Sequence, residues 1–475
     1  MTKQKRTILF IICLSLFIIL APVIILYSAG YRLDIKERRI TQAGGFYFRV
    51  QPKNASISIQ GKPKKQTDLL FGTALIENLT PKSYQVSVNK NGHIAWTKSL
   101  IIEPRKVTEA KNITLVPKNI ISSELDGNSA RLFRSPKGNR IILEKYRDGF
   151  EYFAFISSSN REEIISSADL FGEEQIYIHK FIFSDNEQLA LTKVSIANNI
   201  NSQRYYLLDY RPDNRLAIIP AVKLIINIPN DAKNIRFSPD GSQQLLFIAN
   251  DFLWKTVSNG KSIELRKNIK AFTFSGNDLY YLDSRGFTYK SDSNVSYSDR
   301  INDSPFLLKE DNVHEIGIYG NLLTIKDGES FSRFNQNTRQ FEKIFNQTSE
   351  IRLSPDNKKL AIISGSEIWL LYLYDSPDAP YKKAGELVFL TRLSDQAKSI
   401  YWYTSHYLIF TAKDIVKIIE IDDRDVVNVA EPTFYTNIDN GLISQKNIDI
   451  VFNERVQRLY LLSDNVLYLS GKIVN

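Results

Sequence analysis

The sequence has very little cysteine or histidine. Cys13 is the only cysteine in 475 residues. It lies in an apolar run without a second cysteine, so neither an intrachain disulfide nor a cysteine metal site can form. The four histidines are spread along the chain without a second ligand at metal spacing; they are His93, His179, His314 and His406. We therefore predict no metal and no cofactor, and we interpret each histidine as a surface group or a hydrogen-bonded strand residue.

Sequence motifs of common catalytic sites are also missing. The chain contains no G-x-S-x-G, no Walker loop and no H-E-x-x-H. These motifs mark the nucleophile of a hydrolase, a nucleotide phosphate site and a zinc peptidase. We therefore predict no catalytic residue and expect that the protein is not an enzyme.

The charge shows no strong excess of one sign. Lys and Arg number 61 against 52 Asp and Glu, which gives +9 without a single basic run. This balance predicts no nucleic-acid partner, although weak attraction to an acidic surface is allowed. A hydrophobic fraction of 43% with 24 Tyr and 27 Phe is typical of a folded, strand-rich chain. The length predicts more than one folded unit.

One segment is long and apolar. Residues Ile8 to Tyr27 form 20 residues without a charge, enough for a helix to span a bilayer. A cleaved signal peptide is the alternative, but its apolar core is usually shorter, and bulky Tyr27 stands where a small residue is needed. We predict a cytoplasmic tail at 1–7 and an uncleaved transmembrane helix at 8–28. The C-terminal part is then expected outside the cytoplasmic membrane, in a single-pass topology.

A small β-sandwich is predicted after a linker at 29–45. Alternation at Ile57 to Ile59 and at Tyr84 to Val88 is typical of half-buried strands. Asn91-Gly92 between two such runs is a hairpin signal, because both residues accept positive φ. The predicted unit covers 46–117.

This unit resembles the PEGA domain family of bacterial surface and envelope proteins. The resemblance is carried by "PKNASISIQGK" from Pro52, "IENLTPKSYQVSV" from Ile76, "NKNGHIAW" from Asn89 and "NITLVP" from Asn112. It implies no catalytic residue. Trp96 and Tyr84 could stack on a ligand, but aromatic residues in the strands of a small sandwich are usually core, and we predict that role.

The remaining residues, 118–475, contain a repeated unit of strand, turn and strand. The repeats lie about 45 residues apart on average, the interval of a four-stranded propeller blade. The turns occur at Ser135, Ser184, Ser238, Ser275, Tyr319, Ser354, Tyr403 and Asn453. An all-β fold is therefore predicted, with a β-propeller of eight blades, or seven as the alternative. Residues Asn119 to Leu125 are expected to complete the last blade and close the ring.

The repeats resemble the WD-like propeller repeats of the TolB type, which have Ser-Pro-Asp-Gly after an inner strand. The match is good at Ser238 to Gly241 and at Ser354 to Asn357. Asp240, Asp356 and Asp185 are interpreted as holding the same turn position in separate blades. A repeated aspartate favours a role in the turn over catalysis.

One acidic segment, Ile421 to Asp425, could bind a cation. It lacks the glycine and terminal glutamate of a calcium loop. We predict a solvated loop at a blade edge and no metal site.

These features favour a membrane-anchored binding or scaffold protein of the bacterial cell envelope, whose propeller loops hold a protein or a wall polymer. One alternative is an enzyme with its site in the propeller channel, cleaving a glycan or an ester with acids or histidines from several blades. A second alternative is an assembly platform on the cytoplasmic side. The ligand and the oligomeric state stay open.

Overall fold

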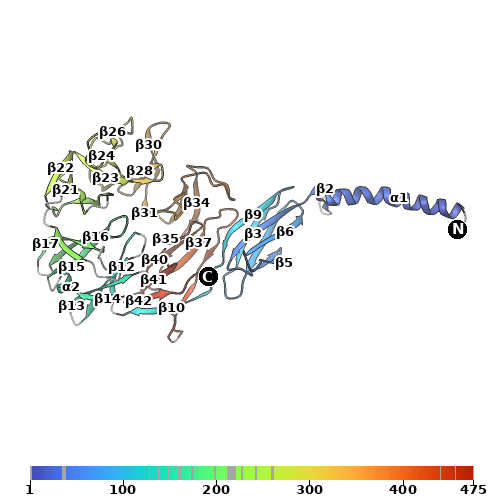
Figure 1. The fold of residues 1–475 in the computed structure, drawn as a ribbon, viewed down its shortest axis with the longest axis horizontal. Coiled ribbons are helices and arrows are strands. Elements are labelled where there is room, and N and C mark those ends of the chain that lie inside the picture. Colours follow the sequence, from blue (N-terminus) through green and yellow to red (C-terminus); the bar gives the residue numbers. More distant parts are fainter. Residues whose placement is uncertain are drawn as a thin grey trace.

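The computed structural model describes most of the chain (Figure 1). The described residues are 3–34, 39–127, 129–136, 138, 140–147, 150–157, 162–172, 176–196, 199–210, 221–225, 228–240, 243–257, 261–438, 440–454 and 456–473. Apart from α1 (Lys3–Ser28) and the short helix α2 (Ser167–Phe171), the described elements are strands. The prediction of an all-β fold behind one apolar helix is therefore confirmed.

The N-terminal helix projects from the strand-rich part of the molecule (Figure 1). Helix α1 (Lys3–Ser28) begins five residues before the apolar run, so the basic residues of the predicted tail belong to the helix. Residues Arg6–Ser28 are long and apolar enough to cross a membrane, and a signal sequence would meet the same criteria.

The predicted linker contains a hairpin of β1 (Tyr31–Asp34) and β2 (Arg39–Gln42). The guanidinium of Arg32 lies 3.8 Å from the centre of the Tyr27 ring. It also donates a hydrogen bond of 2.5 Å to the Asn78 side chain in the next unit. The segment predicted as a linker therefore contains paired strands that contact both the helix and the sandwich.

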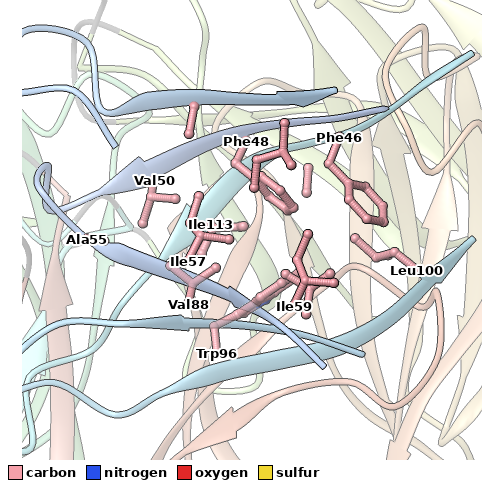
Figure 2. Packing of buried hydrophobic residues seen from close by; sticks show 14 of the residues in the cluster. Phe46, Phe48, Val50, Ala55, Ile57, Ile59, Val88, Trp96, Leu100 and Ile113 are labelled. Atoms are coloured by element: carbon pink, nitrogen blue, oxygen red, sulfur yellow. The ribbon is translucent and has the colours of Figure 1, made fainter. Parts of the chain in front are cut away.

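Two sheets enclose the first core. One sheet has the order β6 (Thr73–Leu79), β3 (Gly44–Gln51), β9 (Val107–Thr114), and the other has β5 (Lys62–Gln66), β4 (Ser56–Ile59), β7 (Ser83–Asn89), β8 (Trp96–Ile101). Inward residues such as Phe46, Phe48, Ile57 and Trp96 form one buried cluster between the sheets (Figure 2). The hairpin predicted at Asn91-Gly92 joins β7 to β8.

Eight further sheets follow in the described part of the chain, and we number them in chain order. Sheets 1 to 4 are β11 (Ser129–Arg134), β12 (Arg140–Arg147), β13 (Phe150–Ser157), β14 (Glu162–Ser166); β15 (Ile176–Phe183), β16 (Leu189–Ile196), β17 (Asn199–Asp209), β18 (Ala221–Ile225); β19 (Lys233–Phe237), β20 (Leu245–Ala249), β21 (Phe252–Thr256), β22 (Ser262–Lys267); and β23 (Ile269–Ser275), β24 (Asp278–Asp283), β25 (Thr288–Ser291), β26 (Asp299–Arg300).

Sheets 5 to 8 complete the series. They are β27 (His314–Tyr319), β28 (Leu322–Asp327), β29 (Ser330–Asn335), β30 (Gln340–Phe345); β31 (Thr348–Leu353), β32 (Lys359–Ser364), β33 (Glu367–Tyr372), β34 (Leu387–Arg392); β35 (Lys398–Thr404), β36 (Tyr407–Ala412), β37 (Ile415–Glu420), β38 (Val429–Ala430); and β39 (Thr433–Thr436), β10 (Asn119–Asp126), β42 (Val466–Ser470), β41 (Arg458–Ser463), β40 (Asp449–Asn453).

The sheets form a closed ring, the arrangement of a propeller (Figure 1). Each sheet shares a buried apolar cluster with the next sheet. A further cluster joins Ile141 and Leu143 of sheet 1 to Tyr460 and Leu467 of sheet 8, which closes the ring. No sheet therefore has to bury its two faces alone.

Strand β10 connects the sandwich to the ring closure. It pairs antiparallel with β42, the last strand of the chain that the structure describes, and parallel with β39. The predicted closing strand is therefore confirmed, with β39 as an additional outer neighbour.

The repeated serines form turns between first and second strands. The Ser354 Oγ accepts from the Lys359 amide at 2.9 Å and donates to Asp356, whose carboxylate accepts from the Lys358 amide at 3.1 Å. This geometry supports the turn interpretation for Asp356. In sheet 2 the equivalent position is Asn186, which accepts from Ser184 at 2.8 Å. The assignment of Asp185 to this position was therefore one residue out.

Candidate functional site at the domain junction

The sandwich docks on sheets 6 and 7 of the ring through a buried charged contact. The Lys98 Nζ lies 2.7 Å from the Glu420 carboxylate, and the two side chains are 0% and 4% exposed. The indole of Trp96 donates to the same carboxylate at 2.7 Å. The Asn428 amide and its side chain supply further donors, at 2.9 and 2.7 Å. Burial of an ion pair is tolerated only when such additional hydrogen bonds are made.

The acidic segment Ile421 to Asp425 forms the ring side of this junction. Lys98 Nζ donates to the Asp422 carbonyl at 2.6 Å, and the Ser99 amide donates to the Asp425 carboxylate at 2.7 Å. Arg424 donates to the Glu109 carbonyl at 2.8 Å and pairs with Asp422. Burial opposes ionisation of Asp422, but Arg424 and Lys98 hold its pKa below the ordinary value. The prediction of a solvated loop was wrong, since these residues contact the sandwich.

An apolar contact lies beside the charged one. Ile94 and Val116, at the end of the sandwich nearest the ring, pack into the cluster shared by sheets 7 and 8. The Tyr407 hydroxyl accepts a hydrogen bond of 2.9 Å from the Thr114 amide. Burial raises the pKa of Tyr407 well above its usual value, so the hydroxyl stays neutral.

A cavity of about 140 Å³ lies at this junction. Its walls come from Trp96 and Lys111 of the sandwich and from Asp356, Tyr374 and His406 of the ring. Pockets often form where two domains meet. Burial lowers the pKa of His406, so its imidazole favours the neutral form.

Several charged groups around this cavity form ion pairs with one another. Asp356 pairs with Lys359 at 2.6 Å, and Lys111 lies 3.4 Å from Asp378. Among the residues that the structure describes, no group of histidine, cysteine and carboxylate side chains could hold a metal ion. Several of the charged side chains that line the cavity are therefore neutralised by ion pairs within the protein.

A second set of polar side chains faces the centre of the ring. The Arg134 guanidinium of sheet 1 lies 4.3 Å from the centre of the Tyr401 ring of sheet 7. These sheets are not neighbours, because sheet 8 lies between them, so the contact crosses the space inside the ring. Arg352 of sheet 6 lies 5.7 Å from the same ring and pairs with Glu350. Burial raises the pKa of Tyr319 of sheet 5.

The residues singled out by sequence occupy separate places. His93 contacts the Asn91 carbonyl at 2.9 Å, and His179 contacts Ser195 at 2.8 Å. His314 is buried 3.3 Å from Asp327, and burial lowers its pKa. The four histidines therefore do not converge.

The two sandwich aromatics are core residues, as predicted. Tyr84 is buried and donates from its hydroxyl to the Thr80 carbonyl at 3.0 Å. Trp96 is buried as well, but its indole also reaches Glu420, a role that strand alternation could not reveal. The channel arginines were missed too, because no sequence signal tells which face of an inner strand points to the centre.

No family model and no curated protein matches this chain. Among solved structures, a computationally designed protein, Ika8, matches with a TM-score of 0.45 and 9% identity over 74% of this chain and 99% of its own. BamB from Moraxella catarrhalis matches with a TM-score of 0.42 and 10% identity over 74% and 100%. The dihydro-heme d1 dehydrogenase NirN matches with a TM-score of 0.41 and 10% identity over 72% and 71%. Likeness at this level says nothing about function.

Proposed function

We propose that this protein is a non-enzymatic, membrane-anchored scaffold that holds an eight-bladed propeller at the outer side of the cytoplasmic membrane. In this proposal each of the eight sheets is one blade, and the sandwich is a PEGA-like module. The blade loops bind an envelope protein or a cell-wall polymer.

The buried junction between Lys98 and Glu420 supports this proposal most directly. A flexible tether would need only a polar linker, whereas this chain buries a charged pair, an indole and an apolar cluster between its two units. Such a contact fixes the orientation of the ring relative to the sandwich. A fixed orientation is useful to a protein that presents a surface to a partner.

Strand direction defines the surface available for such a partner. Neighbouring strands within each of sheets 1 to 7 are antiparallel, so first-to-second and third-to-fourth connections emerge on one face of the ring. The sandwich covers part of this face through the connection 421–428. The corresponding connections of sheets 4 and 5, at 292–298 and 336–339, are left for a partner.

The topology is tested by protease treatment of intact cells and of opened cells that carry the full chain with a C-terminal tag. The proposal expects the protease to remove the tag once the layers outside the cytoplasmic membrane are permeable, while that membrane is still intact. A tag protected until the cytoplasmic membrane is opened would instead support the cytoplasmic platform.

The binding role is tested by crosslinking in cells that express the full chain or a chain lacking 118–475. The proposal expects a partner, protein or polymer, that is captured only by the full chain. A shortened chain that still captures every partner would refute the role of the ring. Turnover of a panel of glycans and esters by the purified full chain would favour the alternative enzyme.

A further inference from the structure

Residues of both folded units line the cavity at the domain junction, so a molecule inside it would contact the sandwich and the ring together. The apolar part of its wall consists mainly of Trp96, Ala110, Ile113, Tyr372, Tyr374 and Ile421. The volume of the cavity is about 140 Å³. A protein cavity of about 150 Å³ accepts one benzene molecule. The junction cavity therefore has room for one six-membered ring.

The charged side chains of the cavity wall are nearly all paired within the protein. The pairs are Asp356 with Lys359, Asp422 with Arg424, Asp378 with Lys111, Glu420 with Lys98, and Asp375 with Lys383. Among the described residues that line the cavity, Lys358 is the one charged side chain without such a pair, and it is exposed. An ionic ligand would have to compete with these pairs and leave charges unpaired, which is costly in a partly buried site. The wall therefore favours a neutral ligand.

Several neutral polar side chains of the same wall have no partner. Tyr372, at the end of β33, is only 4% exposed, and its hydroxyl makes no hydrogen bond to any residue that the structure describes. The His406 imidazole and the Asn112 side-chain amide also line the cavity without a hydrogen bond to a described residue. Asn112 belongs to the sandwich, whereas Tyr372 and His406 belong to the ring. A buried hydroxyl without a partner is costly, so the Tyr372 hydroxyl marks a position where a ligand group or a water molecule has to bind.

The hydrogen-bonding capacity of these three groups narrows the class of ligand. A phenol hydroxyl and a side-chain amide can each donate and accept, and a neutral imidazole has one N–H and one bare nitrogen. Burial lowers the pKa of His406, so its imidazole is neutral at pH 7. The hydroxyl groups of a ligand would also both donate and accept, whereas a carboxylate only accepts and an ammonium group only donates. A ring that carries several hydroxyls therefore matches all three groups.

We propose that the junction cavity binds one neutral sugar ring, whose hydroxyl groups form hydrogen bonds with Tyr372, His406 and Asn112. The C–H groups of the sugar would lie against the apolar wall, and the three polar side chains would fix its orientation. This site goes beyond the scaffold function, because it involves neither the blade loops left for a partner nor the membrane topology. A sugar held there contacts both units, so its binding stabilises the docked arrangement of sandwich and ring.

The test is a titration of the full chain followed by saturation-transfer NMR of the ligand, at pH 7 and in a detergent without a sugar headgroup. The probes are glucose and N-acetylglucosamine, and cyclohexanol serves as a six-membered ring with a single hydroxyl. Saturable binding of at least one of the two sugars is expected, with weaker binding of cyclohexanol.

Variants of the cavity wall locate the binding. Tyr372→Phe and Asn112→Ala are each expected to raise the dissociation constant roughly 3- to 10-fold, the effect of losing one neutral hydrogen bond. Tyr297→Phe, at an exposed tyrosine that does not line the cavity, should leave the dissociation constant unchanged.

Thermal unfolding separates binding from folding. Tyr372→Phe removes a hydroxyl without a protein partner, so its unfolding temperature without sugar should not fall below that of the wild type. The rise in unfolding temperature on adding sugar should be smaller than in the wild type. If Tyr372→Phe does not fold, His406→Phe, which removes both ring nitrogens, takes its place with the same expected loss of affinity. The proposal would be overturned by an absence of saturable sugar binding, by cyclohexanol binding as tightly as the sugars, or by equal sugar affinities in the wild type and the cavity variants.

Discussion

Lys98 of the sandwich and Glu420 of the ring form an ion pair that is almost completely removed from solvent. The two residues lie far apart in the sequence, and each belongs to a different folded unit. Their contact makes the sandwich and the ring interdependent, so that damage to either partner is expected to affect both.

Lys98→Met is expected to destabilise the junction by about 3–5 kcal/mol, because it leaves the Glu420 carboxylate buried without its cation. The expected result is a lower unfolding temperature of the ring and faster proteolysis near residue 117. The double variant Lys98→Met, Glu420→Leu removes both charges and should recover much of the loss. Lys106→Met, which breaks an exposed pair with Glu103, is the control. Equal stability of the Lys98 and Lys106 variants would contradict a structural role for the buried pair.

Gly138→Ala is expected to weaken the closure of the ring. Gly138 has a φ of +70°, and an added Cβ would lie 2.6 Å from the Phe452 carbonyl of sheet 8. Gly276→Ala has the same kind of backbone strain at φ +57° but nothing within 4 Å of its Cβ. The strain alone costs roughly 1–2 kcal/mol, and the clash should add about 1–3 kcal/mol at Gly138 only. Chemical unfolding of the two variants measures the difference, and similar losses would show that the close approach is unimportant.

Ser354→Ala removes the group that accepts from the Lys359 amide inside the protein. A buried donor left without a partner costs about 1–3 kcal/mol. The unfolding temperature should therefore fall, whereas Ser394→Ala, at an exposed position, should change it very little. Retention of full stability by Ser354→Ala would mean that water replaces the hydroxyl in the turn.

Stability is expected to fall as the pH drops below the ordinary histidine pKa of 6.5, partly through His406. Its folded-state pKa lies below the unfolded value because of burial, so the unfolded chain binds the proton more tightly. The stabilisation is present above pH 6.5 and is lost as the pH falls through the folded pKa. Thermal unfolding between pH 7.5 and 5 should show a weaker pH dependence for His406→Gln than for the wild type. His93→Gln, in the turn between β7 and β8, is the control. An equal dependence of the unfolding temperature on pH in the His406→Gln variant and the wild type would rule out this contribution.

Periodicity predicted much of the fold because the repeats are local. In sheets 1 to 7 each turn position, such as Ser135 and Ser354, lies at or near the end of the first strand of its sheet, and Asn453 ends β40 of sheet 8. The closing strand was also predictable, since a ring needs a partner for its last sheet. Tyr84 and Trp96 were predicted to be core residues of the sandwich, and both are buried.

The junction could not be predicted in this way. Ile421 to Asp425 has the composition of a solvated loop, and only the three-dimensional packing brings Lys98 and Ser99 to it. The same limit applies to the centre of the ring, because the orientation of each sheet relative to the ring axis decides whether Arg134 points to the centre. Long-range pairing of charges is not encoded in any local pattern.

Strand β10 has a consequence for biosynthesis. It is made immediately after the sandwich, whereas its antiparallel partner β42 is made only after the strands of sheets 1 to 7. During translation the sandwich can fold, but β10 keeps an unpaired edge and sheet 1 keeps an uncovered apolar face. A nascent chain interrupted shortly before β42 would therefore be a nearly complete ring with exposed apolar surface, which makes the synthesis of β42 decisive for quality control.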